Sequence, residues 1–326
     1  NGEDEYVETF EQARERLAET IARIKFEQWQ FDRQWTDLRE YAREHGVRFI
    51  GDAPIFVAMD SADVWANREL FQIGDDGDPE VVAGVPPDYF SETGQKWGNP
   101  QSDYEWWLDR LERLTETVAL TRIDHFRGFE AYWEVPADAP TAETGQWVEG
   151  PGDEFFKAVA DEFGEPPLIA EDLGTITEEV HELRDRHDLP GMKVMQFAFE
   201  GDPDHPFLPH TYPENCVAYT GTHDNDTTLS WYRRADEATK HGVRTYLSHG
   251  DEGIVWAMIE AIMESDAALN VFPVQDILGL GREARMNTPG TEADNWSWRM
   301  TDEQLGDEGW EQLGKLTEST ERTDPT

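Results

Sequence analysis

Carboxylates at the ends of apolar runs are the residues of this sequence whose type and spacing could do chemistry. In the segment Leu120, Arg122 and Asp124, a strand would turn all three side chains to one face, with the polar pair at its end. A guanidinium beside a carboxylate keeps that carboxylate ionised, which suits a nucleophile. The alternative is an ordinary Arg–Asp ion pair closing a strand, and this segment taken alone favours the ion pair.

A second carboxylate, Glu171, follows the apolar run Leu168–Ala170 and precedes Asp172. Apolar surroundings and a neighbouring like charge would raise the pKa of this carboxyl, as a general acid requires. Adjacent parallel strands lie about 4.8 Å apart, so two strand-end carboxylates can be about 5–5.5 Å apart. That separation is typical of retaining glycoside chemistry through a covalent intermediate. A capping or helix-dipole role for Glu171 stays open at this point.

A third polar cluster, His223–Asp226, follows the apolar run Val217–Thr220. Its His and Asp side chains could bond sugar hydroxyls and stabilise positive charge at an anomeric carbon. Asp and Asn also supply hard oxygen ligands, but their spacing does not follow the calcium-loop pattern, so we expect no metal and no cofactor. Three such clusters on successive strand ends, among abundant aromatic residues, favour a carbohydrate-active enzyme.

Short apolar runs that alternate with helical patterns must position these groups. The strand candidates are 47–57, 118–123, 167–170, 192–199, 216–220 and 269–274, and the helix candidates between them are 106–116, 153–163, 177–187, 236–248 and 252–265. This alternation predicts a parallel sheet covered by helices. Ahead of them, residues 8–45 predict one long helix. Its apolar stripe, expected to be buried, consists of Phe10, Leu17, Ile21, Ile24, Trp35 and Leu38.

Polar groups at the ends of several strands favour a closed barrel over an open sheet, which would gather its ligand groups at one switch point. We therefore predict an α/β fold, a (β/α)8 TIM barrel with inserted subdomain loops. The six strand candidates and a start at Asn1 within a helical pattern indicate a fragment whose first two strand–helix units are missing. The predicted division is an N-terminally incomplete barrel over 1–316, an insertion at about 58–105 over the active site, and a polar tail over 317–326.

Composition excludes several classes of protein. The chain has 326 residues and a formal net charge of −43, from 27 Lys and Arg against 70 Asp and Glu. Such acidity argues against a nucleic-acid partner. No window is apolar enough for a membrane span, no signal-peptide pattern opens the sequence, and Cys216 is the single cysteine, so we expect a cytoplasmic protein. Molar salt shortens the Debye length to about 3 Å, so this charge predicts adaptation to a salt-rich, halophilic cytoplasm.

Long segments in chain order carry a family resemblance. They are Ile50–Val57, Asp60–Trp65, Ala83–Gly94, Arg122–Gly128, Ala170–Gly174, Leu189–Val194, Gly221–Thr228 and Ala284–Gly290. Through them the sequence resembles glycoside hydrolase family 77, the 4-α-glucanotransferases or amylomaltases, which are relatives of the α-amylases. The resemblance extends from Phe26–Trp35 to Trp296–Arg299. The stretch Asn99–Trp106 departs from the family pattern because it is shorter.

The resemblance implies roles for particular residues. Asp124 would be the nucleophile, Glu171 the general acid/base, and Asp224 the third carboxylate, which binds and distorts the sugar at the cleavage site. Arg122 and His223 would support that subsite, with Asp52 a weaker candidate. The implied glucan contacts beyond it are Tyr89, Phe90, Gln95 and Trp97, on a flexible loop over the acceptor side, and Asn287 in the glucan channel.

The resemblance also implies a reaction. An α-1,4-glucan segment of a maltodextrin or starch-type donor would pass through a covalent glucosyl-enzyme to the 4-hydroxyl of glucose or a malto-oligosaccharide. One alternative is a retaining α-glucan hydrolase, in which water intercepts the intermediate. The other is a non-catalytic glucan-binding truncation, which the three carboxylates disfavour.

Overall fold

The computed structural model describes residues 9–74, 77–87, 93, 95–98, 104–165, 167–291 and 293–323, with the side chains at 95, 97 and 98 outside this description. The chain divides into two compact units. The first holds residues 1–52 and 105–121, and the second holds 53–104 and 122–326. The boundary runs through two strands, β1 (Ile50–Pro54) and β4 (Leu120–Asp124).

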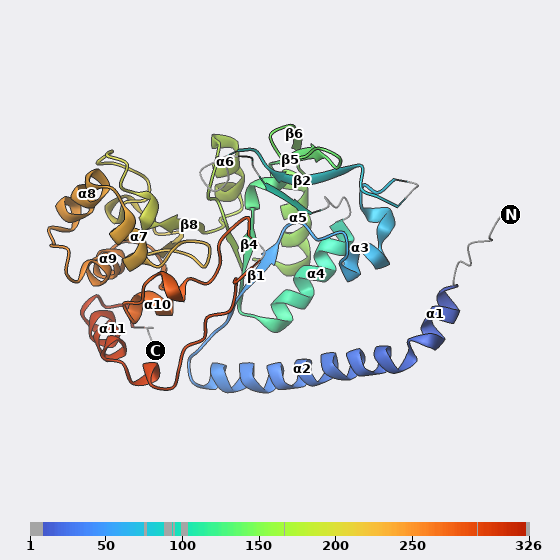
Figure 1. Cartoon of the computed structure of the whole chain (residues 1–326), viewed down its shortest axis with the longest axis horizontal. Helices are drawn as coiled ribbons and strands as arrows, with labels where there is room; N and C mark the ends of the chain where they lie inside the picture. Colours follow the sequence, from blue (N-terminus) through green and yellow to red (C-terminus); the bar gives the residue numbers. More distant parts are fainter. Residues whose placement is uncertain are drawn as a thin grey trace. The chain divides into compact units, whose positions relative to one another are not determined.

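The first unit is built on the helices α1 (Phe10–Arg16), α2 (Ala18–Glu44) and most of α4 (Tyr104–Thr117). Figure 1 shows α2 as the long blue helix, with α1 at its N-terminal end. The Trp35 indole anchors α2, since its Nε1 donates to the Thr117 carbonyl at 2.8 Å and its ring lies 4.8 Å from that of Phe49. These contacts join the C-terminal half of α2 to the end of α4.

The prediction of a single buried helix over 8–45 was wrong in two respects. The helix is interrupted at Leu17, and α1 buries none of its residues. The apolar stripe is largely open, with Phe10 64% and Leu38 49% exposed, and α2 buries only Ala42. Helical periodicity reports which residues share a face, but burial needs a partner for that face.

The second unit contains the parallel strands β8 (Gly191–Val194), β9 (Cys216–Tyr219) and β10 (Leu269–Val271), in the order β10-β9-β8. Their register places Lys193 beside Ala218 and Leu269 beside Val217. Strand β7 (Leu168–Ala170) belongs to the order β1-β4-β7, and Ala170 N donates to the Pro190 carbonyl just before β8. A strand overlaps each of the six predicted apolar runs, and a mixed α/β fold is confirmed.

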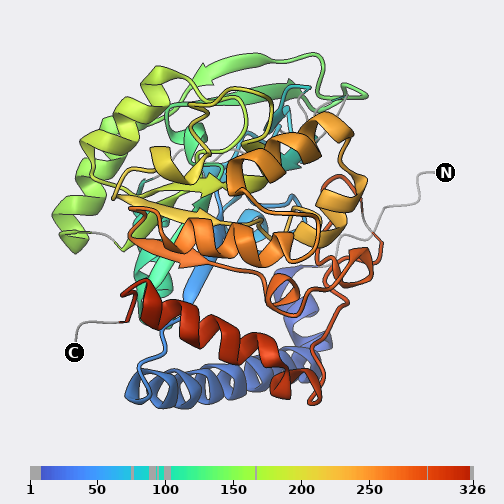
Figure 2. The same cartoon turned by 90° about the vertical axis from the view of Figure 1, so that its left-hand side faces the viewer.

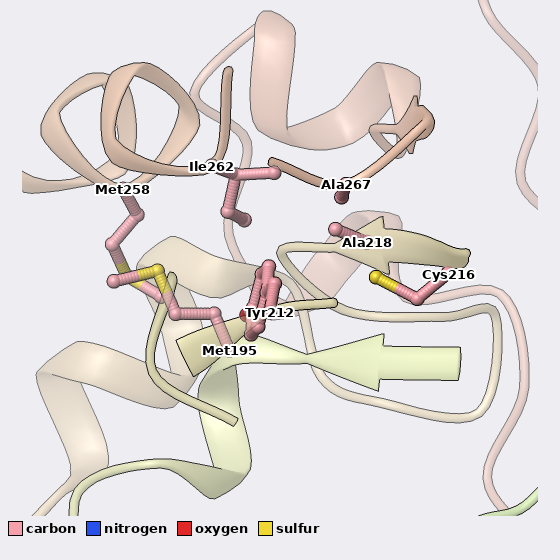
Figure 3. Close-up of a cluster of buried hydrophobic side chains, with 7 residues drawn as sticks. All are labelled: Met195, Tyr212, Cys216, Ala218, Met258, Ile262 and Ala267. Atoms are coloured by element: carbon pink, nitrogen blue, oxygen red, sulfur yellow. The ribbon is translucent and has the colours of Figure 1, made fainter. Parts of the chain in front are cut away.

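Helices follow most of these strands. They are α3 (Ala62–Ala66), α5 (Gly152–Phe163), α6 (Glu178–Arg186), α7 (Thr228–Arg234), α8 (Glu237–Leu247), α9 (Ile254–Met263), α10 (Val274–Ile277) and α11 (Glu308–Ser319). Figure 2 shows β8, β9 and β10 with the orange helices around them. Figure 3 shows why α9 lies against this sheet: its Met258 and Ile262 pack with Ala218 of β9 in a fully buried cluster. Burial of such side chains contributes about 1.5–3 kcal/mol each.

An antiparallel sheet was not foreseen. Its strands, in the order β3-β2-β5-β6, are β3 (Gln95–Gly98), β2 (Val81–Val85), β5 (Ala131–Pro136) and β6 (Gln146–Glu149). Val82 pairs with Val135, and Trp133 pairs with Trp147, whose ring lies 5.2 Å away edge-on. This sheet brings part of the predicted insertion, 58–105, together with a segment that follows β4.

The end of the chain is joined to α9. The Arg322 guanidinium donates to the carbonyls of Met263 at 2.6 Å, Ala267 at 2.7 Å and Ser265. Helix α11 continues through the predicted boundary at 316/317 to Ser319, and the predicted domain limits stay a prediction. In the described part of the chain, none of the helices has the length and apolarity needed to cross a membrane.

Candidate active site

The end of β4 presents an ion pair. Arg122 Nη2 lies 2.8 Å from Asp124 Oδ1, with the Arg122 side chain 10% exposed and that of Asp124 44% exposed. A guanidinium at this distance favours the ionised carboxylate. The pair is therefore the strand-closing ion pair considered for this segment, and its carboxylate is also open to solvent, as a nucleophile must be.

His125 turns the chain sharply after β4. Its backbone is left-handed, with φ 56°, which is uncommon for a residue other than glycine. In this conformation its N–H donates to Glu171 Oε2 at 2.7 Å, and the next N–H, of Phe126, donates to the Glu171 carbonyl at 3.1 Å. Burial lowers the pKa of the His125 imidazole to about 3, so the ring is neutral at physiological pH. The residue that follows the proposed nucleophile thus holds the proposed acid through its main chain.

Glu171 is a buried carboxyl, 8% exposed, immediately after β7. Burial, and to a lesser extent the charge of Asp124, raise its pKa to about 8, although Arg122 and the N–H groups of His125 and Leu173 oppose the rise. The Leu173 bond, 3.0 Å to Oε1, lies in the loop before α6, whose N-cap is Thr177. Glu171 therefore does not cap that helix, and it keeps a proton near neutral pH, as a general acid does.

Asp172, the acidic residue next to Glu171, makes structural contacts. Asp172 pairs with the Arg184 guanidinium through Oδ2 and accepts from Met192 N through Oδ1 at 2.7 Å. It thus ties the end of β7 to α6 and to β8. The like charge that acts on Glu171 is that of Asp124, rather than that of its sequence neighbour Asp172.

The loop between β9 and α7 carries the third cluster. Asn225 Oδ1 accepts from both N and Oγ1 of Thr222 at 2.9 Å, and Asp224 N donates to Thr222 Oγ1 at 3.3 Å. This tight turn presents Asp224, and His223 Nε2 lies 3.3 Å from Asp224 Oδ2. Asp226 Oδ2 accepts a hydrogen bond from Ser230 Oγ at 2.8 Å, which ties Asp226 to the first turn of α7.

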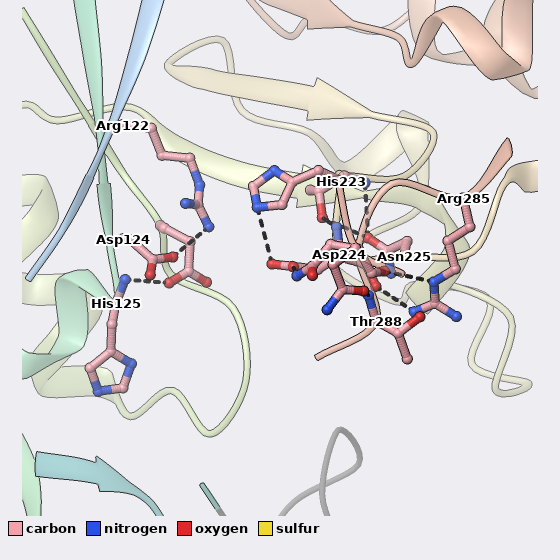
Figure 4. Close-up of polar contacts among 12 residues, drawn as sticks. Arg122, Asp124, His125, His223, Asp224, Asn225, Arg285 and Thr288 are labelled. Carbon is pink, nitrogen blue, oxygen red and sulfur yellow. Dashed lines mark hydrogen bonds and ion pairs between the residues drawn. The ribbon is translucent and has the colours of Figure 1, made fainter. Parts of the chain in front are cut away.

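Two residues from the segment after α10 hold Asp224. Asn287 Nδ2 donates to Asp224 Oδ1 at 2.6 Å, and Arg285 Nη2 donates to the Asp224 carbonyl at 2.7 Å. Figure 4 shows this group, with Arg285 and Thr288 beside Asp224, facing the group of Arg122 and Asp124. Asn287, expected in a glucan channel, thus also orients the third carboxylate.

One pocket, of about 290 Å³, joins the two groups. Its lining includes Asp124, Glu171 and Asp224, together with Arg122 and Asn287. Asp124 ends β4, Glu171 directly follows β7, and Asp224 lies in the loop after β9. The three carboxylates line a space that a sugar ring could enter. In the described ranges of the chain, no group of three or more His, Cys, Asp or Glu side chains is arranged to hold a metal ion.

The remaining predicted site residues are not among those that line this pocket in the described ranges. His223 lines an adjoining pocket of about 230 Å³. Asp52 lies on β1 in the first unit with an exposed side chain, so its place in the site stays a prediction. Tyr89 and Phe90 lie outside the described residues, as do residues 99–103 of the short stretch Asn99–Trp106. Gln95 and Trp97 are described only as backbone of β3.

Sequence reasoning missed an aromatic wall of the pocket. The Arg127 guanidinium lies 3.9 Å from the ring centre of Trp147, and both residues line the pocket. Arg127 stands in the segment Arg122–Gly128 that carried the family resemblance, so its position in that segment was a usable signal. Trp147 lies on β6, and nothing local in the sequence indicates that this strand borders the site.

Comparisons with known protein families, sequences and structures all identify the same family of similar proteins. Residues 3–304 match the 4-alpha-glucanotransferase family, glycoside hydrolase family 77. The chain is 52% identical to a 4-alpha-glucanotransferase of Thermus thermophilus, over 95% of this chain and 65% of that protein. It is 48% identical to one of Synechocystis, over 90% of this chain and 60% of the relative. Among solved structures, an amylomaltase from Streptococcus agalactiae in complex with acarbose superposes with a TM-score of 0.91 at 36% identity, covering 94% of this chain and 64% of that one. The chain thus spans less than two thirds of the length of these proteins.

Proposed function

The chain belongs to glycoside hydrolase family 77, the 4-alpha-glucanotransferases, and on that premise we propose that it transfers α-1,4-glucan segments between maltodextrins. The observation that carries the proposal is the pocket shared by Asp124, Glu171 and Asp224. The 4-alpha-glucanotransferase relatives and the amylomaltase structure in complex with acarbose support a glucan as the ligand of this pocket. The proposed acceptors are glucose and malto-oligosaccharides.

The proposed reaction is a retaining double displacement. Asp124, ionised beside Arg122, attacks the anomeric carbon, while Glu171 gives its proton to the departing glycosidic oxygen. Glu171, now a carboxylate, then takes the proton from the 4-hydroxyl of the acceptor, which attacks the glucosyl-enzyme and releases Asp124. Asp224, oriented by Asn287, bonds the sugar hydroxyls and favours the distorted ring.

The same intermediate could be taken by water, and transfer wins only when a sugar acceptor is oriented and water is excluded. With maltotriose as the sole substrate, we expect glucose and longer maltodextrins to form while the number of reducing ends stays constant. Chromatography of the products together with a reducing-end assay checks this. A net rise in reducing ends would support the hydrolase, and glucan binding without turnover would support a non-catalytic protein.

We also propose that the parallel strands belong to a (β/α)8 barrel. Strands β1, β4 and β7 are neighbours in one sheet and β8, β9 and β10 in another, each in chain order, and the three carboxylates of the pocket stand at or after the C-terminal ends of β4, β7 and β9. This placement is typical of barrel enzymes. The likeness to amylomaltase structures supports the same assignment.

The acidity supports a salt-rich cytoplasm as the working environment. With a net charge of −43, the acidic side chains repel one another at low ionic strength, and molar salt screens that repulsion. The melting temperature is therefore expected to rise by several degrees between 0.05 M and 2 M KCl. A thermal melt followed by circular dichroism measures it, and a flat or falling melting temperature would contradict salt adaptation.

A further inference from the structure

A buried carboxylate outside the proposed reaction lies behind the loop of Asp224. Asp276, on α10, is 1% exposed. Its Oδ2 accepts from the hydroxyls of Thr220 and Thr228, each at 2.6 Å, and its Oδ1 accepts from Thr228 N at 2.8 Å. Both threonines are fully buried, so these bonds are shielded from water.

The two threonines flank the loop 221–227. Thr220 follows β9 directly, and Thr228 is the first residue of α7. One carboxylate therefore joins the point where the chain leaves the sheet to the point where it enters the helix. Gln196 strengthens this junction, because its Nε2 donates to the Asp226 carbonyl at 3.1 Å and to Thr228 Oγ1 at 3.2 Å.

Two sets of bonds act on this loop in different ways. The bonds between Thr222 and Asn225 fix its internal shape. The bonds to Asp276 fix where that shape is placed, because they hold both of its ends. Resting on the proposed function, we propose that Asp276 is a positioning residue that clamps loop 221–227 and so sets the location of Asp224 in the glucan site.

The energetics agree with such a role. Burial raises the pKa of Asp276, and the bonds from Thr220 and Thr228 oppose that rise. A buried carboxyl is costly compared with a well-packed apolar side chain, and its best-supported use is to specify one arrangement. Asp276 does so for a loop whose displacement by about 1 Å would cost about 100-fold in rate.

Three variants test the clamp. Asp276→Asn keeps the size of the side chain but replaces one carboxylate oxygen with an NH2 group. Where that group takes the place of Oδ2, it cannot accept the hydrogen bonds that the hydroxyls of Thr220 and Thr228 donate. Thr220→Val removes one hydroxyl at constant volume, and Thr220→Ser keeps that hydroxyl and should restore function. Ile262→Val, in the core cluster on α9, is the control, because it lowers stability without touching the loop.

Two experiments are made on each protein. The first is kcat and KM for maltotriose, alongside the melting temperature. The second is hydrogen exchange of the peptide that covers loop 221–227, followed by mass spectrometry. For Asp276→Asn and Thr220→Val we expect kcat to fall at least tenfold and loop exchange to become at least tenfold faster, while Thr220→Ser and Ile262→Val stay within about threefold of the parent protein.

The two proposals fail in different ways. If the parent protein does not turn over maltotriose, the proposed function fails, and loop exchange in Asp276→Asn still decides the clamp. If the parent is active, unchanged loop exchange in both variants overturns the clamp. A kcat of both variants within twofold of the parent overturns the positioning role, whatever their melting temperatures.

Discussion

Replacing Asp124 with alanine is expected to abolish transfer, lowering kcat for maltotriose disproportionation at least about 10⁴-fold, as loss of a covalent nucleophile does in other enzymes. The carboxylate oxygens supply the bond to the anomeric carbon, and alanine offers no atom that could replace them. Arg122, which lies 2.8 Å from this carboxylate, also loses its counter-ion. The measurement is chromatography of the products at saturating maltotriose.

A trapping experiment separates loss of the nucleophile from general damage. A 5-fluoro-α-glucosyl fluoride should add one glycosyl mass to the parent protein and none to Asp124→Ala, as read by intact-protein mass spectrometry. Asp161→Ala, which removes an exposed carboxylate on α5, is the matched control and should keep activity within about twofold. Near-normal turnover by Asp124→Ala would refute the assignment of the nucleophile.

Glu171→Gln is expected to lower kcat for maltotriose about 10²- to 10⁴-fold, the usual contribution of a general acid. In the parent protein, burial and Asp124 raise the pKa of Glu171 to about 8. Because the first step needs the protonated acid, kcat/KM should fall as the pH rises through that pKa. The glutamine variant holds no such proton, so this alkaline decline should disappear from its pH profile.

The leaving group provides the decisive comparison for Glu171. Fluoride departs without a proton. The Glu171→Gln substitution should therefore lower kcat far less with α-maltosyl fluoride as the donor than with maltotriose. The control, Glu162→Gln, changes an exposed carboxyl of α5 and should leave both donors unaffected. An equal loss with the two donors would show that Glu171 is not the acid.

Local patterns predicted the parts of the site that depend on neighbouring residues in the sequence. The run Leu168–Ala170 became β7, and Glu171 stands at its end, because burial of a strand and the polarity of its terminus are both local features. The same reasoning placed Asp124 at the end of β4. Alternation of strands and helices was enough to predict the α/β class.

Features that depend on distant residues were not predictable in this way. The role of Asp172 follows from Arg184 and Met192, and that of Asn287 follows from Asp224, 63 residues earlier. The antiparallel sheet joins Val82 to Val135, a pairing that neither segment reveals alone. The exposed face of α2 was misjudged for the same reason, because periodicity does not say what covers a face.

The left-handed turn at His125 also limits what amino-acid replacement can reveal. The hydrogen that steadies the Glu171 carboxylate belongs to a peptide group, so every substitution except proline retains it. What a new side chain can alter is the ease of reaching φ 56°, which is greatest for glycine or asparagine and least for valine or isoleucine. The effect of a substitution at His125 should therefore depend on how easily the new residue adopts a left-handed backbone, and not on its chemical similarity to imidazole. A ranking of substitutions by chemical similarity would give the wrong order.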